Sequence, residues 1–170
     1  MLNNLDRLQA GCTTSGLLTA TGGVTTYDTT VTIVYHLDGK LKTKTAITTG
    51  TTPTTDIRTG LAFPALVGGA SVANTPGQGA IVVWCLKFSD GTVVATQGPA
   101  QALDMQGNFV TAPQFPAIPE GLVPFAYQVL KAGATASATA IVFGTANWNA
   151  TGFTNVIQNV AVLPSRPQVA

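Results

Sequence analysis

The sequence predicts an all-β fold, an antiparallel sandwich or an open barrel, on three observations. Stretches rich in Thr, Val, Ile and Tyr alternate with a period of two, the spacing of a half-buried strand. Two of these stretches contain a turn signal, Asp38-Gly39 and Asp90-Gly91, as β-hairpins require. After the first residues, no amphipathic pattern of normal helix length occurs. The length of 170 residues suits one domain, so we assign residues 1–11 to an N-terminal arm and residues 12–170 to a single β-rich domain.

The arm carries the only helical spacing in the chain. Leu2, Leu5 and Leu8 recur at every third position, and Gly11 follows where a helix would stop. A segment this short does not hold a helix alone in water, so the arm, helical or extended, must dock on its own domain or on a neighbour. We expect its leucines to make a contact between subunits.

The first hairpin is predicted over residues 25–49, around Asp38-Gly39. A two-residue loop would put the lysines of the second strand on the same face as Tyr35. A three-residue loop beginning at Leu37 would set Tyr35 opposite Leu41 and move these lysines to the other face. This second register separates apolar from polar side chains, so it is the one predicted, with a bulge at the glycine. The lysines are Lys40, Lys42 and Lys44.

The second hairpin is predicted over residues 80–98, around Ser89-Asp90-Gly91. Its first strand is apolar on both faces, so we expect it to be central in a sheet that is covered on both sides. Further strands are predicted over residues 124–131, 137–144 and 153–163, a turn at residues 106–108, and loops over residues 48–60 and 112–124.

Charged side chains make up 9% of the chain, against about 25% in an average soluble domain. A net charge of +1 provides no basic stripe for nucleic acid. The longest apolar run, residues 80–86, is far too short to cross a membrane, and no signal-peptide pattern is present. We therefore expect neither a nucleic-acid nor a membrane partner. A neutral surface of hydroxyls and amides is instead typical of a protein that lies against other proteins.

The residues that carry chemistry are few. The single histidine, His36, is expected to be a half-exposed strand residue, and no nucleophile motif accompanies it. Cys12 and Cys85 lie far apart without CxxC spacing and are expected to be free thiols. The acidic residues are spread almost evenly along the chain. We expect no catalytic residue, no cofactor and no metal site.

Two of the aromatic residues outside the predicted strands are candidates for contacts with other molecules. Trp148, in a polar loop, is interpreted either as a buried plug at the end of the fold or as a platform that stacks on carbohydrate. Phe115 flanks the proline-broken segment and would anchor it to the core or to another subunit.

Three stretches resemble structural proteins of tailed bacteriophages. They are residues 112–129 with Lys131-Ala132-Gly133 just after, the ending with Asn147-Trp148-Asn149 and Leu163-Pro164-Ser165-Arg166-Pro167, and, less distinctly, the hairpin around Asp38-Gly39. The resemblance implies a virion component, either a head decoration or minor capsid protein or a part of a tail or fibre. It implies no catalytic residues.

Composition agrees with this resemblance. We expect a non-enzymatic virion protein, assembled in the host cytoplasm, that decorates or cements a capsid. It would form a homo-oligomer, with a trimer favoured, and bind the major capsid protein or another virion protein. The alternative is a tail-fibre or adhesin module that recognises host glycans. The candidate interface residues are Leu2, Leu5, Leu8, Phe115 and Trp148.

Overall fold

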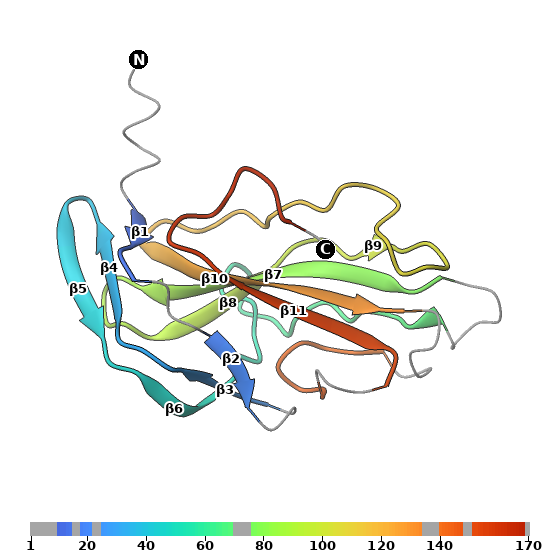
Figure 1. Cartoon of the computed structure of the whole chain (residues 1–170), viewed down its shortest axis with the longest axis horizontal. Helices are drawn as coiled ribbons and strands as arrows, with labels where there is room; N and C mark the ends of the chain where they lie inside the picture. The colour runs from blue at the N-terminus through green and yellow to red at the C-terminus, as the bar shows by residue number, and fades with distance from the viewer. Residues whose placement is uncertain are drawn as a thin grey trace, which may run out of the picture.

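The fold is all-β and sandwich-like, as predicted, and consists of three antiparallel sheets (Figure 1). The computed structural model describes residues 10–14, 18–21, 25–69, 76–133, 140–147 and 151–168. The strands are β1 (Ala10–Cys12), β2 (Leu18–Thr21), β3 (Thr26–Thr29), β4 (Ile33–Leu37), β5 (Lys40–Lys44), β6 (Ile47–Thr51), β7 (Gln78–Lys87), β8 (Val93–Gln97), β9 (Gln101–Ala102), β10 (Leu122–Ala132) and β11 (Phe153–Asn159).

The largest sheet runs through the middle of the molecule in the order β11-β10-β7-β8, with β9 paired to one end of β7 (Figure 1). Every residue from Ala80 to Leu86 in β7 is at most 1% exposed. Neighbouring strands cover both edges of β7, and side chains pack on both of its faces. The prediction that this strand is central and covered on both sides is confirmed.

Two clusters of buried side chains lie on opposite faces of this sheet. Val82, Trp84 and Leu86 join a cluster with residues of the two N-terminal sheets, among them Cys12, Leu18, Tyr27, Ile33 and Tyr35. Ile81, Val83 and Cys85 join a second cluster with Tyr127 and Val129, against which loop residues such as Phe109, Phe115, Ile118 and Leu163 pack. Strands therefore cover one face of the sheet, and irregular segments cover the other.

Residues 26–51 form a long hairpin that is divided between two sheets. Its outer part pairs β4 with β5, and its inner part pairs β3 with β6. β1 then joins β4, and β2 joins β3. The predicted loop over residues 48–60 was wrong at its start, because Ile47–Thr51 forms β6. The β-branched Thr and Ile residues of that segment favour a strand, and β3 supplies the partner.

The predicted register of this hairpin was also wrong. Tyr35 lies opposite Lys42, not Leu41, so the turn contains only Asp38 and Gly39. Both turn residues have positive φ, 50° for Asp38 and 72° for Gly39, as a two-residue turn of type I′ requires. The lysines consequently share a face with Tyr35.

The contacts of Lys42 explain why this register is stable. Its ammonium group donates to the carbonyl oxygens of Phe88 and Ser89, the second at 3.0 Å, and lies 4.6 Å from the centroid of the Phe88 ring. The aliphatic stem of a lysine packs on apolar surface while its charged end reaches acceptors. A pattern that treats lysine as purely polar therefore assigns it to the wrong face.

The remaining expectations are met in part. β11 occupies the first part of the predicted strand 153–163. Over residues 140–144 of the predicted strand 137–144, the structure has one bridge, from Ile141 to Leu66, followed by a turn. Gly144 has a φ of 80°, which ends extended pairing there; residues 134–139 lie outside the described residues. Residues 1–9 of the predicted arm also lie outside them, whereas Ala10 and Gly11 belong to β1.

Candidate functional site

The few residues with acid–base chemistry are dispersed in the structure. His36 is half-buried on β4, opposite Gly11 of β1 and Leu41 of β5. Within the described residues, no three His, Cys, Asp or Glu side chains lie close enough to hold a metal ion together. The same part of the chain contains no helix with the length and hydropathy needed to cross a membrane.

Asp56 is a buried carboxylate whose hydrogen bonds connect its loop to the largest sheet. It accepts hydrogen bonds from the Arg58 guanidinium at 3.1 Å, from the Arg58 backbone N–H at 2.8 Å and from the Gln97 backbone N–H at 3.1 Å. Burial raises the pKa of Asp56, but these hydrogen bonds outweigh it, so the net pKa is lowered. The carboxylate therefore stays charged and attaches its loop to β8.

Both cysteines are buried free thiols. The Cys12 thiol donates to the Pro124 carbonyl oxygen at 3.5 Å, and burial raises its pKa to about 12. Burial, and to a smaller extent Cys12, raise the pKa of Cys85 as well. Since the thiolate is the reactive form, neither side chain is suited to nucleophilic chemistry near neutral pH.

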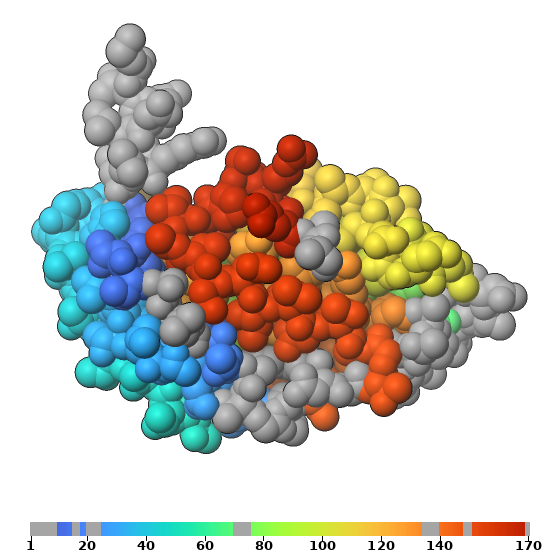
Figure 2. All heavy atoms as spheres, in the orientation of Figure 1, coloured from blue at the N-terminus to red at the C-terminus, as the bar shows by residue number. Residues whose placement is uncertain are grey.

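A furrow runs over the surface between residues 112–121 and residues 162–167. It consists of five hollows of about 280 to 550 Å³, and each hollow shares lining residues with the next. The shared residues are, in order along the furrow, Ala112, Pro113, Arg166 and Pro167; Phe115 and Ser165; Ile118, Val162 and Leu163; and Leu37, Pro119, Glu120, Gly121 and Leu122. Figure 2 shows the C-terminal segment (red) between β1 (blue) and the segment around residue 110 (yellow).

The floor of the furrow rests on the central sheet. Phe115, Ile118 and Leu163 are half-buried and pack on the second cluster of buried side chains. The Phe115 ring meets the ring of Tyr127, on β10, edge-on, with 5.1 Å between the centroids. This floor is apolar and is held in place by the sheet beneath it.

One wall of the furrow is an extended segment without strand partners. Pro113, Pro116 and Pro119 lack a backbone N–H, so residues 112–119 cannot form a regular ladder. Among the described residues, no backbone hydrogen bond joins residues 112–119 to another part of the chain. The Gln114 carbonyl oxygen lies against Gly98, 2.9 Å from the place of a Cβ atom there, so it faces the body of the protein. An extended peptide can bond only to those other N–H and C=O groups of the wall that face the furrow.

The two ends of the furrow differ in charge. The hollows at the end formed by β1 and the hairpin turns are lined by acidic and basic residues together, namely Asp38, Glu120 and Lys87, and by Ala10. Lys131 and Arg166 line the hollow at the opposite end, and no acidic residue lines it with them. Lys131 lines the first hollow and Pro124 the fourth; both residues are on β10, seven residues apart, a distance of about 23 Å at the rise of a strand.

The structure brings one of the predicted interface residues to this furrow. Phe115 lines two of its hollows. Leu2, Leu5, Leu8 and Trp148 lie outside the described residues. Sequence reasoning missed Lys131 and Arg166, although Arg166 stands in one of the proline-containing stretches on which the resemblance rests.

Comparison with known proteins identifies no relative of this chain. No protein-family model, no curated protein and no solved structure matches it.

Proposed function

We propose that this protein is a non-enzymatic structural component of a tailed-phage virion, which coats the head as a homo-oligomer. The furrow supports this proposal. It combines an apolar floor, a wall without backbone hydrogen bonds to other described residues, and a span of about 23 Å between the hollows lined by Lys131 and Pro124, the length of roughly seven extended residues. Such a surface fits a polypeptide segment, because main-chain hydrogen bonds and apolar pockets together bind an extended chain.

The segment proposed for the furrow is the leucine-bearing N-terminus of a neighbouring copy. Residues 1–9 directly precede Ala10, and Leu2, Leu5 and Leu8 give this segment the apolar character that suits the hollows around Ile118 and Leu163. A contact of this kind gives each subunit one donor segment and one receiving furrow. In a closed ring of copies, such as a trimer, every furrow is then occupied by the segment of a neighbour.

Contacts with the shell would be mostly uncharged. The chain has eight basic and seven acidic residues, too few for an extensive ionic interface. Apolar contacts are not screened by salt, whereas ionic contacts between exposed groups are. Attachment to shells would therefore survive molar sodium chloride.

The test combines sedimentation of capsid shells with the purified protein, over a series of salt concentrations, and light scattering of the protein alone. The expected result is an oligomer that sediments with shells at every salt concentration. Deleting residues 1–9, or replacing Val162, which lines the furrow and is 49% exposed, with Asp, should weaken the oligomer. The matched control is Val67→Asp, because Val67 is 40% exposed and does not line the furrow hollows.

Two results would overturn the proposal. One is a monomer that ignores shells but binds host glycans, which would favour the adhesin alternative. The other is an equal loss of the oligomer in the Val162 and Val67 variants, which would mean that the furrow is not the contact.

A further inference from the structure

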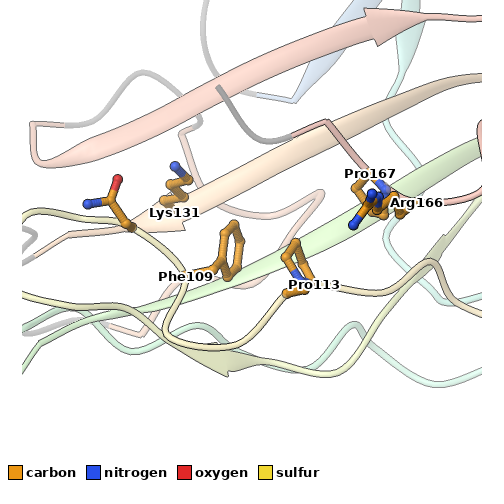
Figure 3. A pocket seen from close by; sticks show the side chains of 7 residues that line it. Phe109, Pro113, Lys131, Arg166 and Pro167 are labelled. Carbon is orange, nitrogen blue, oxygen red and sulfur yellow. The ribbon is translucent and has the colours of Figure 1, made fainter.

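The furrow ends in a hollow of about 350 Å³ that is lined by two cationic side chains (Figure 3). We term it the cationic hollow. It is lined by Asn108, Phe109, Ala112, Pro113, Lys131, Arg166 and Pro167. Phe109 and Pro113 lie between Lys131 on one side and Arg166 and Pro167 on the other (Figure 3). The hollow therefore has an apolar middle with a positive charge at either side.

Lys131 is an unusual residue for this position. Its side chain is only 9% exposed, although lysine is rarely buried without an ionic partner. Its ammonium group lies 5.4 Å from the centroid of the Phe109 ring. Within the described part of the chain, the only ion pair is that of Arg58 with Asp56, so no carboxylate neutralises Lys131 there.

The Phe109 ring beside the ammonium group rests on the central sheet. Lys131 lies opposite Gly79 in the pairing of β10 with β7. A Cβ atom on Gly79 would lie 2.7 Å from the Phe109 ring, so the ring occupies the space that the missing side chain leaves. Phe109 in turn contacts the ammonium group, and the cationic hollow is thus built on the central sheet.

Asp104, which is bonded to Asn108 of the hollow, forms no ion pair with Lys131. The Asp104 carboxylate accepts hydrogen bonds from the backbone N–H groups of Gln106 and Asn108, at 2.9 and 2.8 Å, and from the Asn108 side chain at 3.2 Å. These bonds lower its pKa and commit it to its own turn. A carboxylate for the cationic hollow must therefore come from outside the described part of this subunit.

We propose that the cationic hollow binds the carboxylate of Asp6 from the N-terminal segment of a neighbouring copy. This inference rests on the proposed function and names the polar contact of the same interface. In an extended chain, Leu2, Asp6 and Leu8 share one face, whereas Arg7 points the opposite way. Asp6 can therefore enter the hollow while Leu2 lies in the apolar part of the furrow and Arg7 faces away from Lys131.

Distance disfavours the same contact within one subunit. Ala10 lines a hollow together with Pro124, and Pro124 lies seven residues, about 23 Å, from Lys131 along β10. The four residues from Ala10 back to Asp6 extend at most about 14 Å, so this piece of chain and both side chains would all have to stretch toward each other. The neighbouring copy has no such restriction, and the proposal therefore places the contact between copies.

A double-mutant cycle on the full chain tests the proposal, with the dissociation constant of the oligomer as the readout. Asp6→Asn and Lys131→Met should each weaken self-association about tenfold, and the double variant should be no weaker than either single variant. Lys40→Met and Arg7→Gln are the controls and should leave the constant unchanged. A synthetic peptide with the sequence of residues 1–10 should dissociate the oligomer, and the same peptide with Asn at position 6 should need about tenfold more.

The possible failures are distinguishable from failure of the proposed function. If deletion of residues 1–9 weakens the oligomer but Asp6→Asn does not, the furrow contact stands and the role of the cationic hollow is wrong. Additive effects of Asp6→Asn and Lys131→Met, or an Arg7→Gln effect as large as that of Asp6→Asn, would also overturn the pairing. Equal potency of the two peptides in dissociating the oligomer would also overturn the pairing, and this result does not depend on how a variant folds.

Discussion

The indole N–H of Trp84 donates a hydrogen bond to Oε1 of Gln128 across 3.0 Å, in the middle of the largest sheet. Both side chains are fully buried. The Gln128 amide also donates to Oδ1 of Asn155 at 2.7 Å, so side chains of β7, β10 and β11 form one hydrogen-bonded row. Buried polar groups of this kind are stabilising only when every partner is present.

We predict that Gln128→Leu destabilises the fold by about 1–3 kcal/mol, because the buried Trp84 N–H loses this acceptor and the half-buried Asn155 carbonyl oxygen loses this donor. Urea unfolding followed by tryptophan fluorescence measures the change. Gln106→Leu, in an exposed turn, serves as the control and should change the free energy of unfolding by less than about 0.5 kcal/mol. Equal stability of wild type and Gln128→Leu would show that the row contributes nothing.

Asp56 predicts a dependence of stability on pH. Its pKa is lowered in the folded state, so the carboxylate stabilises the fold above the ordinary carboxyl pKa of about 3.9, and this contribution is lost as the pH falls through the lowered value. At pH 7, Asp56→Asn should cost about 1–3 kcal/mol, because the bonds from Arg58 and Gln97 weaken. Denaturation at a series of pH values checks this. If the difference in free energy of unfolding between wild type and Asp56→Asn stayed constant down to pH 2, the prediction would be contradicted.

Lys42 and Lys40 give a matched test of the hairpin register. We expect Lys42→Met to lower the free energy of unfolding by about 1 kcal/mol, since the variant loses the donor to the Phe88 and Ser89 carbonyls. Lys40→Met, at an exposed position, should be neutral. Thermal unfolding of both variants decides the matter, and equal stabilities of wild type and Lys42→Met would mean that the bonds to the Phe88 and Ser89 carbonyls contribute nothing to the register.

The two thiols should be unreactive in the folded protein. Burial raises the pKa of Cys12 to about 12 and raises that of Cys85, so the thiolate is scarce at pH 8. Ellman's reagent should label neither thiol in native buffer and both in guanidinium chloride. Mass spectrometry without reductant complements this measurement. A peptide pair linked through both cysteines, or rapid labelling of native protein, would refute the expectation.

The sequence was sufficient for the features that depend on local pattern. The all-β fold follows from the alternation of apolar and polar residues, and the central position of β7 follows from its two apolar faces. The turn after residue 88 was also predicted, because Ser, Asp and Gly residues favour a tight turn that reverses the chain. These features need no knowledge of which segments meet in space.

Features that depend on distant contacts were decided only by the tertiary structure. Lys42 lies on the apolar face because the β7–β8 turn supplies carbonyl acceptors 46 and 47 residues away, which no local pattern contains. Lys131 and Arg166 likewise share a hollow only because residues 112–121 and 162–167 lie along the same face of the central sheet. The period of a strand determines which side chains share a face, but the choice of face depends on what the rest of the chain places against it.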